Sequence, residues 1–117
     1  MGTPYELVNI TKKEIVSFFR IPASKARELA GNPVSSAITT WYLLTHLGDQ
    51  ITFMSTQEPI WPLESGSIRD VDEFTDVTDQ IVEELIQNKI LVDEGKVFYF
   101  DDEPEIYDRK LRNIWME

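Results

Sequence analysis

The sequence NPVSSAITTWYLLTHL, residues 32–47, decides how the rest of the chain can fold. Asn32 and Pro33 are residue types that begin helices, as N-cap and first helical residue. From there, apolar residues recur with the 3.6-residue period of an amphipathic helix. The stripe consists of Val34, Ala37, Ile38, Trp41, Leu44 and Leu47, and Tyr42 and Leu43 widen it. We therefore predict a central core helix over residues 33–47, ended by Gly48, with Trp41 buried.

The segment before this helix predicts a strand at residues 5–10, which are rich in β-forming side chains. Residues 11–19 allow two interpretations. Thr11 and Glu14 have the spacing of a helix capping box, but the apolar residues that follow also suit the second strand of a hairpin. We favour the hairpin, with its turn at residues 11–13. Ser24 then caps a short predicted helix, and Gly31 takes the left-handed conformation at its end.

The segment after the central helix predicts a strand at residues 50–55 and a loop at residues 56–67 that contains Trp61. A helix is expected at residues 78–88. Its inner face would consist of Ile81, Val82, Leu85 and Ile86. Two apolar runs on either side of Glu94 and Gly95 predict a hairpin over residues 90–100. Asp102 is a suitable cap for a last helix over residues 103–115 that adds Ile106 to the core.

These elements predict an α+β fold, in which residues 1–117 form a single domain. Its small, mainly antiparallel sheet is packed with three to four helices, and the helix at residues 33–47 lies across one face. The hydrophobic fraction of 42% is typical of a globular protein. The chain has no cysteine, and its N-terminal residues lack the pattern of an export signal, which favours a cytoplasmic location. No apolar run approaches the roughly 18 residues of a membrane helix.

The net charge of −10 is unevenly distributed along the chain. Residues 1–57 hold five bases and four acids, a net charge of +1, whereas residues 58–117 hold six bases and seventeen acids, a net charge of −11. A negative potential repels nucleic acid and anionic membrane surfaces and attracts basic proteins. We therefore expect a basic protein partner, and neither nucleic acid nor membrane.

Acidic residues are densest in RDVDEFTDVTDQIVEEL, residues 69–85. An EF-hand loop that began at Asp70 would have Phe74 at a ligand position, Thr75 in place of the glycine and Ile81 in place of the closing glutamate, so the motif fails. Three interpretations remain: a solvated helix face with acids near the helix N-terminus, a protein-binding surface, and a metal site. The candidate protein-binding residues are Asp76, Asp79, Glu83 and Glu84. We expect no tightly bound metal and no cofactor.

Catalytic motifs are weak in this chain. His46 is the only histidine, so a triad would form at the end of the central helix with Asp49 nearby, although a histidine favoured by the helix dipole is the commoner explanation. No nucleophile elbow and no phosphate-binding glycine motif is present. The segment DDEPEIYD supplies carboxylates for a general acid and base pair. They are Asp101, Asp102, Glu103, Glu105 and Asp108.

Exposed aromatic residues are the second possible indication of function. Trp61 lies between two prolines in the loop EPIWP, where it forms either a binding contact or a lid on the core. In the strand KVFYF, Val97 to Phe100 make both faces apolar, so either a helix or another chain covers Phe98 and Phe100.

Two classes of function follow. The first is a non-enzymatic protein-binding domain, such as an immunity or antitoxin-like inhibitor whose acidic C-terminal half covers a basic enzyme. The second is a small carboxylate-dependent hydrolase, which would need its acids to converge in a pocket. A homodimeric accessory protein that pairs through the aromatic strand is a further alternative.

Overall fold

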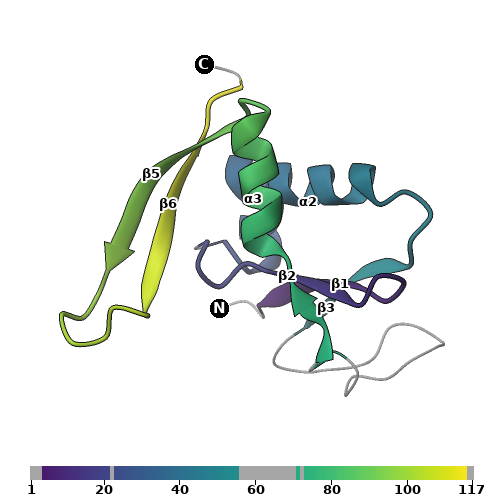
Figure 1. Cartoon of the computed structure of the whole chain (residues 1–117), viewed down its shortest axis with the longest axis horizontal. Helices are drawn as coiled ribbons and strands as arrows, with labels where there is room; N and C mark the ends of the chain where they lie inside the picture. The colour runs from purple at the N-terminus through teal and green to yellow at the C-terminus, as the bar shows by residue number, and fades with distance from the viewer. Residues whose placement is uncertain (1–3, 22, 56–70, 72, 116–117) are drawn as a thin grey trace.

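The computed structural model describes residues 4–21, 23–55, 71 and 73–115. Strands β1 (Tyr5–Asn9) and β2 (Glu14–Ser17) are followed by helices α1 (Ala26–Gly31) and α2 (Pro33–Thr45). Strands β3 (Ile51–Ser55) and β4 (Thr75–Asp76) come next, then helix α3 (Thr78–Gln87) and strands β5 (Leu91–Phe98) and β6 (Tyr107–Asn113). Figure 1 shows β5 and β6 beside α3, away from the other strands.

The larger sheet has the strand order β3-β1-β2-β4. Strand β1 pairs antiparallel with β2 and β3, and Leu7 lies opposite both Val16 and Phe53. Strand β2 pairs parallel with β4. The hairpin interpretation of residues 11–19 is therefore confirmed, and the sheet is mixed. With three helices in the described residues, the architecture is a small α+β domain.

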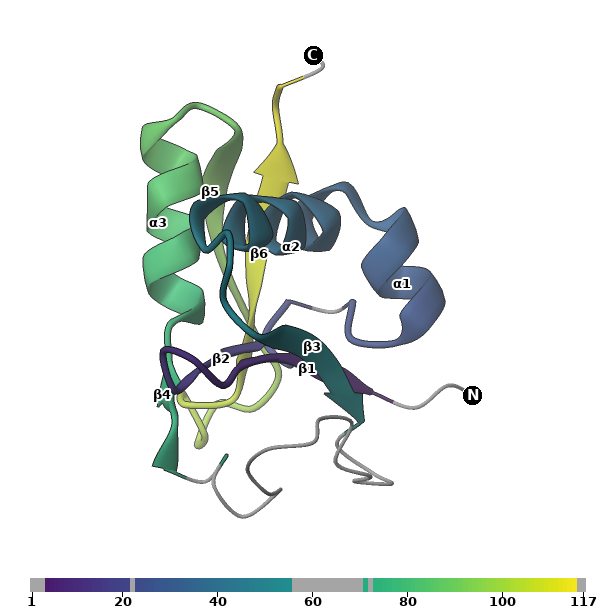
Figure 2. The same ribbon diagram turned by 90° about the vertical axis from the view of Figure 1, so that its right-hand side faces the viewer.

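Neighbouring residues of a strand point to opposite faces of the sheet, and here both faces carry buried apolar side chains. The three helices lie on the face of Leu7, where α2 crosses above β1 and β3 in Figure 2. The buried residues there include Leu7, Val16, Phe18, Val34, Ile38, Tyr42, Ile81, Val82, Leu85 and Leu91. The opposite face holds a smaller cluster of Val8, Met54 and Val71, with Phe74 packed against it.

Helix α2 begins as predicted, with the Asn32 side chain accepting hydrogen bonds from the backbone N–H groups of Val34 and Ser35. Its buried face, however, consists of Val34, Ser35, Ile38 and Tyr42. Trp41 is only partly buried, and its indole N–H donates to Glu84 at 3.3 Å. Leu44 and Leu47, at 60% and 80% exposed, lie outside the core. The predicted stripe was therefore rotated away from the buried face.

At the junction of α1 and α2, the buried face of α2 includes the polar Ser35. The Ser35 hydroxyl lies within hydrogen-bond distance of the carbonyl oxygens of Glu28 and Leu29, so a polar residue closes the contact between the helices. Gly31 is the last residue of α1 and does not have positive φ, and Lys25 rather than Ser24 is the N-cap, contrary to both predictions.

The C-terminal third of the chain differs most from the sequence prediction. Gly95 is not at a hairpin tip: β5 continues through it to Phe98, with a register shift between Asp93 and Lys96. The Gly95 N–H donates to the Asp93 carboxylate, and its φ of +111° is the positive value that a glycine bulge uses. Residues 107–113, predicted as part of a helix, form the partner strand β6.

Helix α3 agrees with its prediction at Thr78–Gln87, and it buries Ile81, Val82 and Leu85. Thr78 attaches its first turn to β2, since its hydroxyl accepts from the Ser17 N–H at 2.8 Å. Within the described part of the chain, none of the helices is long and apolar enough to cross a membrane.

Candidate functional site

The two-stranded sheet of β5 and β6, with the loop at residues 99–106, forms a projection that we call the arm. Its pairing runs from Leu91 opposite Asn113 at the base to Phe98 opposite Tyr107 at the far end. Figure 1 shows this far end lying away from α2 and α3. The base is attached to the domain by Leu91, which is 1% exposed, and by the Ile114 N–H, which donates to the Ile90 carbonyl.

The far end of the arm presents large apolar side chains to solvent. We call Val97, Phe98, Tyr99, Phe100 and Ile106 the aromatic tip. These five side chains are between 42% and 57% exposed, although their residue types are usually buried. Large apolar side chains exposed together at one end of an element are typical of a binding surface. Ile106 was predicted to lie on a helix and to pack in the core of the domain. It lies instead in the loop before β6 and is exposed.

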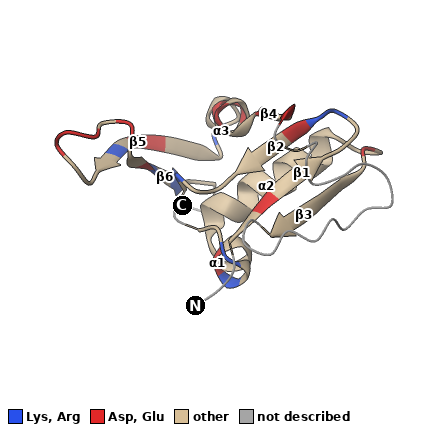
Figure 3. Cartoon of the chain, turned by 90° about the horizontal axis from the view of Figure 1, so that it is seen from below, with Lys and Arg blue, Asp and Glu red and all other residues tan. Residues whose placement is uncertain are grey.

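Four carboxylates lie in the same loop. We call Asp101, Asp102, Glu103 and Glu105 the tip acids. Among the described residues, none of the four forms an ion pair with a base. Figure 3 shows this acidic loop at the end of the arm, separate from the acids of α3. The tip is therefore both apolar and negatively charged.

Three basic residues, Arg20, Lys96 and Arg109, lie on or beside the two strands of the arm, which we call its stem. Arg20 donates to the Tyr107 hydroxyl at 3.0 Å and to the Glu105 carbonyl at 2.9 Å, which fixes the arm to the residues after β2. Arg20 and Lys96 both lie against the Tyr107 ring, at 4.2 and 4.4 Å from its centre. Arg109, 12% exposed, pairs with the carboxylates of Asp79 and Asp93.

Contacts within the arm shift the pKa values of two of its titratable groups. The Gly95 N–H and then Arg109 hold the pKa of Asp93 below its usual value. The hydrogen bond from the Tyr99 hydroxyl to Asp108 raises the pKa of Tyr99. Arg20, Lys96 and Arg109 therefore have partners within the chain, whereas the tip acids form no ion pair among the described residues.

Most of the acids predicted to bind a partner have partners within the chain. Asp76 accepts hydrogen bonds from the backbone and hydroxyl of Thr78, so it caps α3. Asp79 pairs with Arg109 at 2.8 Å, and Glu84 accepts from the Trp41 indole. Only Glu83 is exposed without such a contact in the described residues. Asp76, Asp79 and Glu84 therefore each contact another residue of the chain itself.

Comparison with protein-family models, curated proteins and solved structures finds no match to this chain. The other residues that were predicted to bind a protein partner are Phe98, Phe100 and Trp61. Phe98 and Phe100 are both in the aromatic tip, whereas Trp61 lies outside the described residues. The acids at residues 101–105 were named in the sequence as possible catalytic groups, and they belong to the acidic C-terminal half that was expected to meet a basic partner. Their position beside an apolar strand end, in the motif KVFYFDDEPE, was the feature that could have indicated a binding surface.

A second polar cluster joins the β1–β2 turn to the end of α2. The buried Asn9 amide donates to the Tyr42 hydroxyl and to Asp49, both at 3.0 Å. The Tyr42 hydroxyl donates to Glu14 at 2.8 Å, and the His46 ring stacks on Tyr42 and lies 3.6 Å from Glu14. This network uses its polar groups internally, as structural networks do. Among the described residues, no three histidine, aspartate or glutamate side chains are placed to hold a metal ion.

Burial of Tyr42, together with its hydrogen bond to Glu14, raises the pKa of its hydroxyl well above the ordinary value, although the hydrogen bond from Asn9 opposes this. In the unfolded chain the same hydroxyl loses its proton near pH 10. Above about pH 10 the unfolded state therefore binds fewer protons, and the free energy of unfolding falls by up to about 1.4 kcal/mol per pH unit.

The variant Tyr42→Phe tests this linkage. At pH 7 it should be less stable than wild type by about 1–3 kcal/mol, because Asn9 and Glu14 lose a buried partner. From pH 10 to 11 the difference should shrink, because only the wild type loses stability through this group. Urea unfolding between pH 7 and 11 measures both effects, and stability curves that stay parallel above pH 10 would refute the role of Tyr42.

Proposed function

We propose that this chain is a protein-binding domain whose aromatic tip and tip acids contact a basic partner protein. The observation that carries the proposal is the aromatic tip itself: five large apolar side chains, each at least 42% exposed, next to four carboxylates without ion pairs in the described chain. Aromatic residues surrounded by charged residues are the usual composition of a binding hot spot and its rim.

A hollow beside the tip supports this surface as a contact site. It has a volume of about 320 Å³ and lies between the arm and the junction of α1 and α2. Val34, Val97 and Leu111 give it apolar walls, and Tyr99 and Asp108 line it as well. An apolar side chain of a partner suits such walls, whereas the charged residues of the lining, Asp108, Arg109 and Lys110, carry both signs.

The charge of the chain favours fast encounter with a basic protein. A net charge of −10 on 117 residues attracts positive surfaces over a distance of about 10 Å at moderate salt. An inhibitor or immunity-type protein that must cover a basic enzyme, such as a nuclease, needs this property. We therefore infer this class of partner.

A homodimer through the arm is the second candidate. Strand β5 has one strand neighbour, β6, in the described residues, so its other edge is available for pairing. However, the bulge at Gly95 interrupts that edge, and two copies of the tip acids would repel one another. These observations favour a basic partner over a second copy.

A hydrolase function has weaker support. The acids of α3 and the tip acids belong to different elements, and Asp79 is 80% exposed on the helix. Catalytic carboxylates instead converge in a concave site that excludes water.

A pair of double variants tests which acids attract the partner. Asp101→Asn with Asp102→Asn should slow association roughly threefold or more at low salt, with little effect at ~1 M salt, where the Debye length is about 3 Å. The matched control, Glu73→Gln with Glu83→Gln, also removes two exposed charges and should change the association rate much less.

The partner for this measurement is the protein recovered with the wild-type chain by affinity purification and mass spectrometry, and surface plasmon resonance gives the rates. Equal association rates for both double variants at every salt concentration would show that only net charge matters. That result would contradict a contact site at the tip acids.

A further inference from the structure

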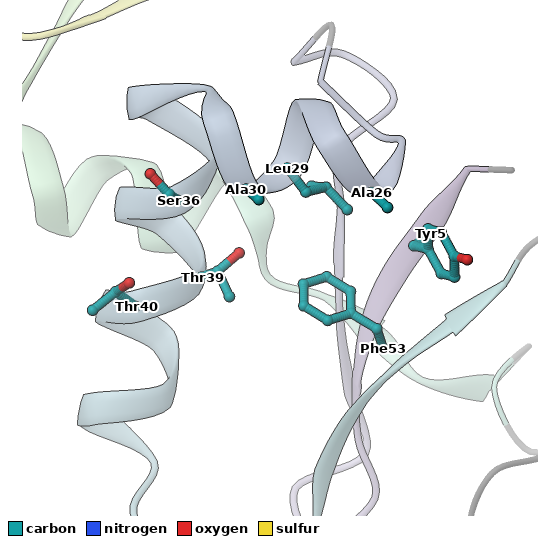
Figure 4. A pocket seen from close by; sticks show the side chains of 8 residues that line it. All are labelled: Tyr5, Ala26, Leu29, Ala30, Ser36, Thr39, Thr40 and Phe53. Atoms are coloured by element: carbon teal, nitrogen blue, oxygen red, sulfur yellow. The ribbon is translucent and has the colours of Figure 1, made fainter. Parts of the chain in front are cut away.

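A second hollow lies on the other side of the domain, between α1, the first half of α2 and strands β1 and β3. Its volume is about 340 Å³. Its lining consists of Tyr5, Ala26, Leu29, Ala30, Ser36, Thr39, Thr40 and Phe53, and Figure 4 shows these side chains. None of these residues belongs to the aromatic tip, so this pocket is independent of the proposed function.

The pocket exists because small side chains occupy its rim. Ala26 and Ala30 are one helical turn apart on α1, so they leave a gap on one face of the helix. Leu29 and Phe53 supply the floor and wall, and in Figure 4 they face Thr39 across the space. No charged side chain is among the lining residues. An apolar pocket without charge favours a neutral molecule, because a charged one would lose its hydration without compensation.

The hydroxyl of Thr39 gives the pocket a polar contact point. In this conformation its oxygen has almost no accessible surface and no hydrogen-bond partner among the described residues. Threonine in a helix has two favoured χ1 rotamers, so a rotation can turn the hydroxyl toward the pocket. The neighbouring serines differ, since the Ser36 hydroxyl donates to the Asn32 carbonyl at 2.9 Å and the Ser35 hydroxyl lies close to carbonyls of α1. Buried hydroxyl groups are rarely left unpaired, because their desolvation is unfavourable. A ligand with one hydrogen-bonding group would satisfy it.

We propose that this pocket binds a small neutral molecule that contains one ring and one hydrogen-bonding group placed against the Thr39 hydroxyl. The volume sets the size. Small-molecule pockets begin at about 300 Å³, and an apolar cavity of about 150 Å³ engineered in another protein binds benzene. A substituted ring therefore fits this space.

Three probes of similar shape test the proposal in titrations followed by ¹H–¹⁵N NMR. The neutral 4-methylphenol should produce saturable shifts at the amides of α1, α2 and β3 around the pocket. Toluene, which lacks the hydroxyl, should bind about fivefold more weakly, as expected for the loss of one neutral hydrogen bond. The charged 4-methylbenzoate should bind more weakly still.

Variants assign the binding to the named residues. Thr39→Val removes the hydroxyl and should weaken 4-methylphenol about fivefold while toluene is unaffected. Ala30→Leu, at an exposed position of the rim, should weaken both probes at least about tenfold by filling the space. Arg27→Leu adds an equally apolar side chain to α1 outside the lining and should change neither.

Several results would overturn the proposal. One is the absence of saturable shifts up to millimolar 4-methylphenol, and another is an unchanged ratio of 4-methylphenol to toluene affinity in Thr39→Val. Shifts centred on the exposed leucines of α2 or on the arm would indicate general apolar adsorption. A capped tyrosine peptide that binds more tightly than 4-methylphenol would replace the small molecule with a protein side chain as the occupant.

Discussion

Replacing Tyr42 with alanine is expected to lower the free energy of unfolding by about 3–5 kcal/mol, the range for deleting a large side chain from a core. Tyr42 is 1% exposed and is among the largest fully buried side chains of the described chain. The substitution opens a cavity between α2 and the sheet, and it leaves the buried Asn9 amide and the Glu14 carboxylate without the Tyr42 hydroxyl. Urea unfolding followed by circular dichroism measures the loss.

Trp41 on α2 and Leu47, which follows the end of α2, serve as comparisons. Trp41→Ala should lower the free energy of unfolding by a smaller amount, about 1–3 kcal/mol, because Trp41 is only partly buried. Leu47→Ala should change stability by less than about 0.5 kcal/mol, because Leu47 is 80% exposed. A larger loss for Trp41→Ala than for Tyr42→Ala would show that α2 is rotated differently from the structure described above.

Phe100→Ala is expected to weaken binding of the basic partner at least about thirtyfold, which corresponds to the 2 kcal/mol or more of a hot-spot residue. Phe98→Ala should have an effect of similar size, since Phe98 is 54% and Phe100 53% exposed. The thermal stability of both variants should remain close to that of wild type, because neither side chain belongs to the core. Isothermal titration calorimetry with the recovered partner gives the affinities.

The matched control for this pair is Leu44→Ala, which removes an exposed apolar side chain, 60% exposed, from the end of α2. Its affinity for the partner should equal that of wild type. If Leu44→Ala weakened binding while Phe98→Ala and Phe100→Ala did not, the contact would lie on α2 rather than on the arm.

The sequence was sufficient for the elements whose determinants are local. The turn at residues 11–13, the cap at Asn32 and the buried face of α3 could all be predicted, because neighbouring residues specify them. The rotation of α2 could not. Its sequence has apolar residues on most sides, and the buried side depends on the hydrogen bonds of the Tyr42 hydroxyl, which accepts from Asn9 and donates to Glu14.

The arm shows a different limit of sequence reasoning. Glu94 and Gly95 suit either a hairpin turn or a bulge, and the choice depends on a partner strand at residues 107–113. That strand was predicted as part of a helix because Asp102 and Pro104 resemble a helix start. Its alternation is visible in retrospect, since Lys110 and Arg112 are exposed while Leu111 and Asn113 are partly buried.

The candidate site was predicted only in part. The apolar run at residues 97–100 was predicted to be a strand throughout, but β5 ends at Phe98, and Tyr99 and Phe100 lie in the loop. The described residues leave the aromatic tip uncovered. Asp79 and Glu84 were predicted to bind a partner, and the residues that they contact in the chain, Arg109 and Trp41, are far away in the sequence. Pairing between distant residues removes charge from a surface in a way that local composition does not reveal.

Site-specific photo-crosslinking in the source cell tests the central claim most directly. A photoreactive phenylalanine analogue is placed at Phe100 in one variant and at the more exposed but remote Leu47 in another. The proposed contact predicts that the Phe100 variant becomes covalently joined to a basic protein, and that the Leu47 variant does not. The same product at both positions, an acidic product, or a second copy of this chain at Phe100 would contradict it.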